Sequence, residues 1–414
     1  MATIRPFAAV RPAKEKANLI AALPYDVMNS DEAREMVKDN PLSFLHVDKS
    51  EIDLPREIDL YDEKVYQKAK ENLYSLIDNN HLITEEKPCL YLYQQIMNGH
   101  AQTGLVACSS VQEYENDIIK KHEHTRAEKE ADRIKHVDTL NAQTGPIFLT
   151  YRAQQEITDR MNEIMKNAPL YDFTAEDDVK HIVWIIENEA DINFFTEKFK
   201  TVNYLYIADG HHRCASAVRV GQRRKAANPN HTGNEEYNYF LSVIFPDNQL
   251  AIMDYNRIVK DLNGNSKEEF LNKVAEMFEI KEVSADQPYH PETAHTFGMY
   301  LDKMWYKLSA KAGTYQENDP VNSLDVSIMQ NNLLNPILGI GDPRTDKRID
   351  FVGGIRGLNE LSKRVDAGEA VAFSMYPTSI EQLMNIADAG QVMPPKSTWF
   401  EPKLRSGLFI HLLG

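Results

Sequence analysis

The chain has 414 residues, of which 42% are hydrophobic and 26% are charged, and this length and balance are typical of a soluble protein with two or three domains. The net charge of −16 disfavours sequence-independent contact with nucleic-acid phosphates, so no nucleic-acid partner is expected. No apolar segment approaches a membrane span and the N-terminus has no hydrophobic signal core, which predicts a cytoplasmic protein with no membrane partner. Cys89, Cys108 and Cys214 lack metal-ligand spacing, so neither disulfides nor a structural metal are expected.

The first third of the chain carries signals for both helices and strands. The apolar run at 43–47 is expected to form a strand, and the periodic apolar residues of 61–79 predict an amphipathic helix. Two β-rich runs, 90–96 and 103–109, flank Asn98-Gly99. Because Asn-Gly between such runs is the strongest short-range hairpin signal, we expect a β-hairpin there.

The segment 120–136 is densely charged and has almost no apolar stripe. As a helix, it would place His122, Arg126, Lys129 and Arg133 along one face, at steps of three and four residues. Two interpretations stay open. The segment is either a solvated helix with many ion pairs or a helix whose cationic face lines an anionic ligand.

Strands and helices alternate through the rest of the N-terminal part. Residues 214–220 are expected to form a short helix that ends at Gly221, a residue suited to a left-handed C-cap. The alternation predicts a mixed α/β, or α+β, fold for a first domain at 1–254. Buried strands are expected at 147–151, 182–186, 202–208 and 239–245.

The strongest indication of a functional site is Asp209-Gly210-His211-His212-Arg213, which joins the strand at 202–208 to the following helix. Residues of these types are costly to bury and poor at building a core. At such a turn, backbone N–H groups and the positive end of the helix dipole converge on a point where an anion can bind. Gly210, His212 and Arg213 are therefore expected to bind phosphate. Asp209 is expected to hold a metal ion or accept a proton, and His211 and His212 to contact phosphate oxygens or shuttle protons.

The turn has a simpler alternative interpretation. Asp209 could cap the helix while the histidines face water. A zinc site is not expected, because adjacent histidines on a helix point in different directions and no third ligand is near in the sequence. Magnesium carried by a nucleotide, held through Asp209, suits the turn better.

A second, α+β domain is expected at 255–414. Two aromatic runs joined through Asp302-Lys303 predict a hairpin. The run Gly353-Gly354-Ile355-Arg356-Gly357 could approach a phosphate but matches no nucleotide-binding pattern, so a plain turn is favoured. Lys396 stays a candidate ligand contact.

Several runs together resemble the bacterial and archaeal family known as domain of unknown function 1015, and the resemblance spans essentially the whole chain. Where that family is expected to carry a His-Arg pair, this chain has Asn256-Arg257. The runs are Pro24-Tyr25-Asp26-Val27, Phe44-Leu45-His46-Val47, the Asp209–Arg213 turn, Phe297-Gly298-Met299-Tyr300, Asp342-Pro343-Arg344-Thr345-Asp346 and Met393-Pro394-Pro395-Lys396-Ser397-Thr398.

More locally, residues 203–221 resemble the phosphate-binding motif of the ParB and sulfiredoxin superfamily, which includes free serine kinases that use ADP. This resemblance implies a ParB/sulfiredoxin-like core in which the turn cradles nucleotide phosphates. It also implies an acidic residue near the N-terminus that activates the substrate hydroxyl, and Asp26 is the candidate here.

These inferences together predict a nucleotide-dependent kinase that phosphorylates the hydroxyl of a small metabolite, with serine as the first acceptor to consider. Mg²⁺ with ADP or ATP is the expected cofactor, and Arg126, Lys129 and Arg133 are expected to complete the anion pocket. A nucleotide-binding regulator without turnover and a phosphohydrolase are the alternatives. The sequence leaves the oligomeric state open.

Overall fold

The computed structural model describes residues 1–285 and 287–414, which divide into two compact units. The first unit comprises residues 1–250 and 402–414, and the second comprises 251–401. The predicted boundary falls between residues 254 and 255. The C-terminal residues 402–414, expected in the second domain, instead return to the first unit, where β21 (His411–Leu412) pairs with β7 (Ala142–Gln143).

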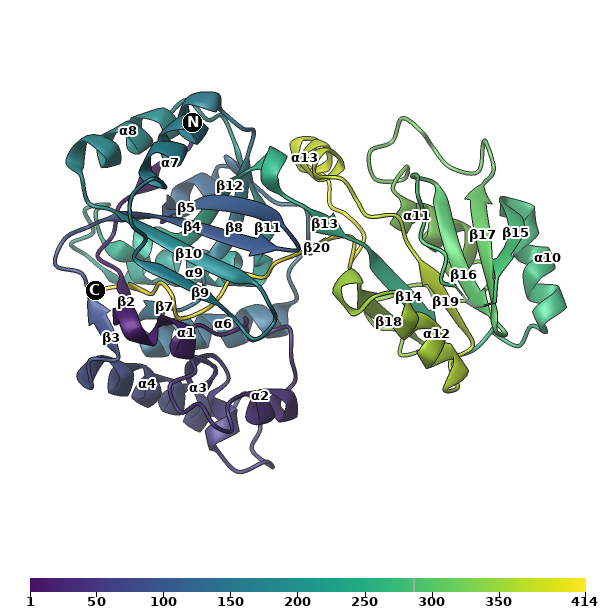
Figure 1. The fold of residues 1–414 in the computed structure, drawn as a ribbon, viewed down its shortest axis with the longest axis horizontal. Coiled ribbons are helices and arrows are strands. Elements are labelled where there is room, and N and C mark those ends of the chain that lie inside the picture. Colours follow the sequence, from purple (N-terminus) through teal and green to yellow (C-terminus); the bar gives the residue numbers. More distant parts are fainter. Residues whose placement is uncertain (286) are drawn as a thin grey trace. The chain divides into compact units, whose positions relative to one another are not determined.

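A mixed sheet organises the first unit, with nine strands among the described residues (Figure 1). The Asn98-Gly99 hairpin is confirmed, with left-handed backbone at both turn residues. The strand that carries the candidate site, β11, is antiparallel to β8 and parallel to the short edge strand β6. The strands follow the order β6 (Ile119–Lys120), β11 (Leu205–Asp209), β8 (Ile147–Tyr151), β12 (Tyr239–Pro246), β5 (His100–Ser110), β4 (Leu90–Met97), β10 (Lys180–Ile186) and β9 (Tyr171–Thr174), and β1 (Ile4–Arg5) also pairs with β5.

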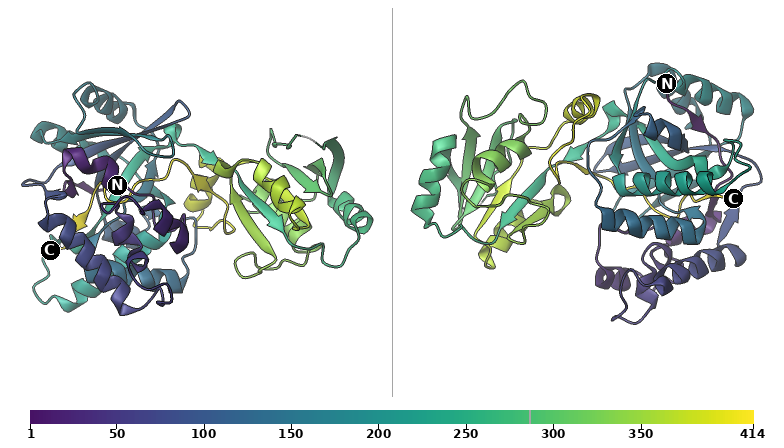
Figure 2. Two further views of the ribbon diagram at one scale, coloured as in Figure 1. Left: turned by 60° about the horizontal axis from the view of Figure 1, so that its bottom comes forward. Right: turned by 180° about the vertical axis from the view of Figure 1, so that it is seen from behind.

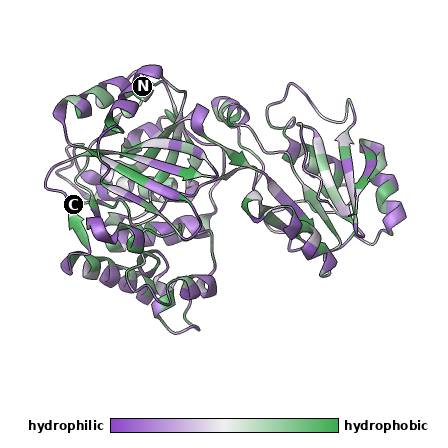
Figure 3. Cartoon of the chain, in the orientation of Figure 1, coloured by the Kyte–Doolittle hydropathy of each residue, from purple (hydrophilic) through white to green (hydrophobic). Residues whose placement is uncertain are grey.

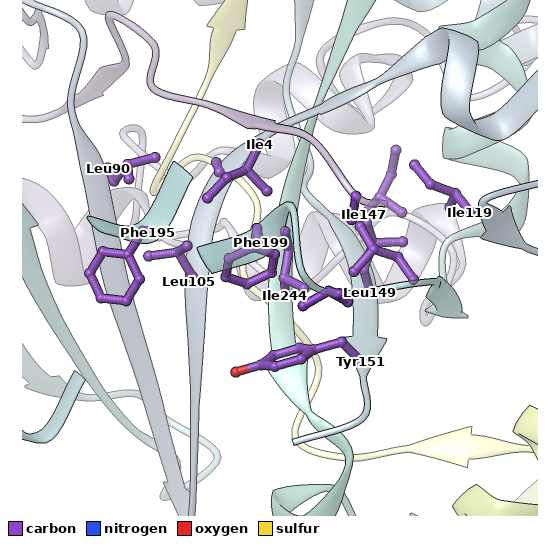
Figure 4. Packing of buried hydrophobic residues seen from close by; sticks show 14 of the residues in the cluster. Ile4, Leu90, Leu105, Ile119, Ile147, Leu149, Tyr151, Phe195, Phe199 and Ile244 are labelled. Carbon is purple, nitrogen blue, oxygen red and sulfur yellow. The ribbon is translucent and has the colours of Figure 1, made fainter. Parts of the chain in front are cut away.

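Alternating side chains of these strands face two different layers. On one face, α7 (Gln155–Ile164) and α8 (Glu189–Phe199) pack onto residues such as Leu105 and Leu149 (Figure 4). On the other face, the C-terminal segment packs through Phe409, whose ring centroid lies 5.1 Å from that of Tyr91. Hydrophobic residues accordingly concentrate in the strands, whereas the helices carry both hydrophobic and hydrophilic residues (Figure 3).

Short helices near the N-terminus form a separate small core around the amphipathic helix α4 (Glu63–Asp78), which confirms the predicted helix at 61–79. The predicted strand at 43–47 is wrong: residues Leu45–Asp48 form helix α3. A short, mostly apolar run of this kind has no periodicity that separates strand from helix. The other elements here are β2 (Val10–Pro12), α1 (Ala17–Ile20), α2 (Ser30–Met36) and β3 (Leu82–Thr84), and α5 (Val111–Glu115) follows β5.

Helices α6 (Ala127–Leu140) and α9 (His211–Ala227) lie side by side, as the right panel of Figure 2 shows. The predicted helix end at Gly221 is wrong, because helix α9 continues past this residue. A Cβ at Gly221 would lie 2.5 Å from the backbone oxygen of Tyr237. The glycine is there for close packing, and the small residues of α9 serve the same purpose.

The second unit is built on an antiparallel sheet, six-stranded in the described part of the chain. The hairpin through Asp302-Lys303 is confirmed, and α12 (Asn359–Asp366) packs on the sheet through Leu361. The mixed α+β class is thereby confirmed. The sheet order is β15 (Phe278–Ser284), β17 (Met304–Ala310), β16 (Thr296–Leu301), β19 (Val371–Ser374), β14 (Tyr255–Val259) and β18 (Ile349–Gly353), and the remaining elements include α10 (Lys267–Met277), α11 (Asp325–Met329), α13 (Ile380–Asp388) and the pair β13 (Ile252–Met253) with β20 (Trp399–Phe400).

None of the helices in 1–285 and 287–414 combines the length and the hydrophobicity that a membrane span requires.

Candidate functional site

The turn between β11 and α9 is built on one glycine. Strand β11 is buried as far as Ala208, Asp209 is half-buried, and Gly210 has a left-handed backbone with φ of 90°. A Cβ at Gly210 would also lie 3.1 Å from the guanidinium atoms of Arg213. The positive φ favours glycine, and an added Cβ would press on the guanidinium. The first i to i+4 bond of the helix joins the N–H of Cys214 to the carbonyl of Gly210, so three N–H groups precede it.

Two cationic side chains, those of Arg213 and Lys403, lie close to the carboxylate of Asp209. Its Oδ2 lies 3.3 Å from Nη2 of Arg213 and 3.7 Å from Nζ of Lys403. Burial opposes ionisation of this carboxyl, but Lys403 and Arg213 outweigh burial and lower the pKa of Asp209 to about 2. Gly210, not Asp209, occupies the N-cap position, and the helix has no side-chain cap. The capping interpretation is therefore not what the structure shows.

The two histidines face different neighbours. His211 is 6% exposed, its ring packs edge-on against that of His122 with 4.5 Å between centroids, and its Nδ1 lies 3.8 Å from Oε2 of Glu123. Burial, followed by the neighbouring His122, holds the pKa of His211 well below its usual range, so the ring is neutral at pH 7. His212 is half-buried, and its Nε2 accepts a hydrogen bond from the backbone N–H of Arg126 at 3.0 Å.

A metal site made of protein side chains alone is not found here. In the part of the chain that the structure describes, no three His, Cys, Asp or Glu side chains are grouped to hold a metal ion. The single carboxylate of Asp209 can contribute to Mg²⁺ only alongside oxygens from another source, such as nucleotide phosphates and water.

Arg213 forms the inner wall of the turn. Its Nη1 donates to the carbonyl oxygen of Pro146 at 2.5 Å. Its Nε is buried and has no hydrogen-bond partner among the described residues, as is also true of Nε2 of His211. Burial works against the charge of Arg213, but Asp209 and then Asp26 raise its pKa, so the guanidinium stays charged.

The predicted cationic helix is wrong in its bounds. Helix α6 begins only at Ala127, with exposed Arg126 at its N-cap, and His122 lies before it. Residues 123–126 lie outside any regular element. The backbone N–H of Arg126 donates to Nε2 of His212 instead of to a carbonyl one helical turn earlier. Lys129 points to Tyr61, with its Nζ 3.3 Å from the hydroxyl. The structure thus does not bring the side chains of Arg126, Lys129 and Arg133 onto one face of the same helix.

Arg133 instead lies near Arg213. The two side chains line one small pocket, together with Tyr25. Asp26 follows Tyr25 and is exposed. Lys403 is not among the predicted site residues, and no local sequence pattern marks it, since it comes to the turn from a distant segment. His122 lies on the predicted cationic face and Tyr25 in the Pro24–Val27 run, but the sequence assigned neither a role of its own.

The motifs of the second unit have structural explanations. A Cβ at Gly353 would lie 2.7 Å from the Trp399 ring, and one at Gly354 would collide with the carboxylate of Asp254. Asn256 is fully buried, and its Oδ1 accepts from the N–H of Met375. The ammonium of Lys396 lies 5.4 Å from the ring centroid of Tyr255.

Comparisons with known proteins add a family and a set of distant structures. The model of a family described as "Protein of unknown function (DUF1015)" matches residues 4–327. A solved structure of a mutant free serine kinase in complex with AMP is similar at 13% identity and a TM-score of 0.36, covering 69% of this chain and 84% of that one. A conserved hypothetical protein from Pyrococcus furiosus is similar at 16% identity and a TM-score of 0.36, covering 72% and 93%.

C-terminally truncated SbnI from Staphylococcus aureus is similar at 12% identity and a TM-score of 0.35, covering 74% of this chain and 87% of that one. No curated protein matches the sequence significantly. At TM-scores in this range, the function has to be argued from the residues of this chain.

Proposed function

Because this chain belongs to the DUF1015 family, whose description assigns no activity, we propose from the geometry of the Asp209–Arg213 turn that the protein is a nucleotide-dependent phosphotransferase acting on the hydroxyl of a small metabolite. The observation that carries the proposal is the meeting of Lys403 and Arg213 at Asp209, directly at the start of a long helix. Cations, helix N–H groups and a carboxylate in one place are what phosphoryl transfer needs.

The phosphate contacts follow from the donors at the turn. The N–H groups of the first turn of α9 and the positive end of its dipole favour a phosphate. Lys403 and Arg213 add charge, and the unpartnered Nε2 of His211 adds a neutral donor or acceptor. Charge neutralisation of this kind supplies most of the catalysis in phosphoryl transfer.

Asp209 is suited to hold a cation rather than to accept a proton. With a pKa of about 2, this carboxylate is almost fully ionised at neutral pH and is a weak base. We assign it to Mg²⁺, which would bring phosphate oxygens into position and neutralise their charge when bound. In this arrangement the nucleotide phosphates are contacted only at their periphery by His212, Arg126 and Lys129.

The hydroxyl proton needs another acceptor, and Asp26 is our candidate. Its carboxylate is exposed and close enough to Arg213 to raise the pKa of that side chain. In the reaction, the hydroxyl oxygen of the acceptor bonds to the terminal phosphorus and its proton passes to Asp26. The bond from that phosphorus to the bridging oxygen breaks, and the shortened nucleotide leaves. The free serine kinases, to which the turn is similar, make serine the first acceptor to test.

Phosphorus NMR tests this proposal. The whole chain is mixed with Mg²⁺, ADP or ATP, and a panel of hydroxy metabolites, and we expect a new phosphomonoester signal that depends on the acceptor. Asp209→Asn should abolish it, whereas Lys166→Gln, at an exposed lysine that pairs with Glu163, should not. Nucleotide binding without any new signal would favour a regulator, and loss of phosphate from a phosphorylated metabolite would favour a phosphohydrolase.

A further inference from the structure

A small, partly open pocket adjoins the Asp209–Arg213 turn on the side of Arg213. Its volume of about 30 Å³ admits a group of a few heavy atoms and not a whole metabolite. The charged residues in its lining are Arg133, Arg213 and Asp48, and Tyr25 and Thr144 add hydroxyl groups. Most pockets of this size are apolar or hold water, so this concentration of charge calls for an explanation.

Arg213, which lines this pocket, also has a buried donor without a partner. Its side chain is only 10% exposed, and its Nε has no hydrogen-bond partner within the described residues. A buried charged donor without an acceptor is destabilising, by more than a neutral one.

Arg133 is held rigidly in the opposite wall. Its Nε and Nη2 lie 2.9 and 2.8 Å from Oδ2 of Asp132, and Oδ1 of Asp132 accepts from the hydroxyl of Tyr66 at 2.8 Å. The guanidinium also stacks on the Tyr25 ring, 4.0 Å from its centroid. A cation fixed in this way loses little entropy when it binds a planar anion.

The remaining charge in the lining is a single carboxylate. Oδ1 of Asp48 accepts from the hydroxyl of Thr144 at 2.7 Å. His136, which also lines the pocket, is neutral because burial and then Arg133 lower its pKa to about 4. Within the lining itself, two guanidinium groups accompany one carboxylate, while Asp132 and Asp209 pair with these guanidiniums from outside it, so a bound anion would share both cations with those carboxylates.

We infer that this pocket binds the carboxylate of the phosphoryl acceptor, so that the acceptor is a short hydroxycarboxylate, with or without an amino group. The inference rests on the proposed function. It assigns Arg133 to binding of the acceptor, not to binding of the phosphate. Arg213 links the two sites, since its Nη2 reaches Asp209 while its side chain also lines the pocket.

Calorimetry with the full chain tests the class of acceptor, with and without Mg²⁺ and ADP. L-serine and glycerate carry the carboxylate, whereas ethanolamine and glycerol lack it. We expect serine, glycerate or both to bind at least about tenfold more tightly than the two compounds without a carboxylate. Equal binding of all four, or tighter binding of ethanolamine or glycerol, would overturn the inference.

Variants at Arg133 separate this inference from the proposed function. Arg133→Gln should weaken binding of the carboxylate compound about tenfold or more and leave ADP affinity unchanged. Because this change leaves Asp132 unpaired, the double variant Asp132→Asn with Arg133→Gln is the matched control for folding, and it should show the same loss. If ADP fails to bind the unaltered protein, the proposed function fails. If ADP binds but Arg133 variants keep full carboxylate affinity, only the pocket inference fails.

Discussion

The ammonium of Lys403 lies 3.7 Å from Oδ2 of Asp209, although the whole second unit separates these residues along the chain. The segment that carries Lys403 is fixed in place. Gln95 donates to its carbonyl oxygen at 2.9 Å, and nearby Arg405, only 4% exposed, donates to Nε2 of His181 at 3.2 Å. The turn is complete only when the C-terminal segment packs on the first unit.

Replacing Lys403 should weaken nucleotide binding. We expect Lys403→Gln to lower the affinity for ADP about ten- to hundredfold, because a charged hydrogen bond contributes about 1.5–3 kcal/mol. Lys403→Arg should retain most of the affinity. Calorimetry measures both, with Lys166→Gln as the control for a general effect of charge. An unchanged affinity in Lys403→Gln would show that this ammonium does not contact the nucleotide.

Gly210→Ala should destabilise the protein by about 1–3 kcal/mol, since alanine would be strained at φ of 90° and would press on Arg213. Gly233→Ala is a matched control, because Gly233 has a φ of 93° but nothing within 4 Å of an added Cβ. Urea unfolding measures both. A smaller loss in Gly210→Ala than in Gly233→Ala would contradict the contact with the guanidinium.

Acid should destabilise the first unit through buried histidines. Burial lowers the pKa of His122 and His136 to about 4, and burial together with Arg405 lowers that of His181 to about 3. The unfolded chain takes up protons on these rings below about pH 6.5, whereas the folded chain keeps them neutral. Stability is therefore full above that pH and falls between about pH 6.5 and 4, by up to about 1.4 kcal/mol per pH unit for each ring.

Unfolding curves at pH 7.5, 6.0 and 5.0 measure this slope. His122→Gln should make it shallower, while His290→Gln, at an exposed position in the second unit, should leave it unchanged. A slope that is the same in all three proteins would mean that His122 is not buried in its neutral form.

Removing the ring of Phe409 should destabilise the first unit by about 3–5 kcal/mol. Phe409 is fully buried, and its ring centroid lies 5.1 Å from that of Tyr91 and 5.9 Å from that of Tyr93. Thermal unfolding of Phe409→Ala, compared with Leu60→Ala at a 48% exposed position, measures the difference. Equal unfolding temperatures would contradict the packing of the C-terminal segment on the sheet.

Local chemistry made several features predictable from the sequence. Asn98-Gly99 between two β-rich runs strongly favours a hairpin turn. The strand that precedes the Asp209–Arg213 turn is apolar enough to be recognised from its own sequence. The turn after it was identifiable because polar residues interrupt two buried elements. In each case the signal lies within a few consecutive residues.

Features that depend on distant contacts were not predictable. Gly221 resembles a helix terminator, yet what requires it is the carbonyl of Tyr237 on a later segment. Helix α6 starts late because the backbone of Arg126 is bound by His212. Lys403 reaches Asp209 only through the return of the chain to the first unit, and nothing in its neighbourhood indicates that partner.

Phosphorus NMR of the whole chain shows whether the Asp209–Arg213 turn transfers a phosphoryl group. With Mg²⁺, a nucleotide and a hydroxycarboxylate such as serine, we expect a phosphomonoester signal that grows with time and is absent in Asp209→Asn. A signal that persists unchanged in Asp209→Asn, or no signal with any nucleotide and acceptor under conditions where the nucleotide binds, would contradict this role of the turn.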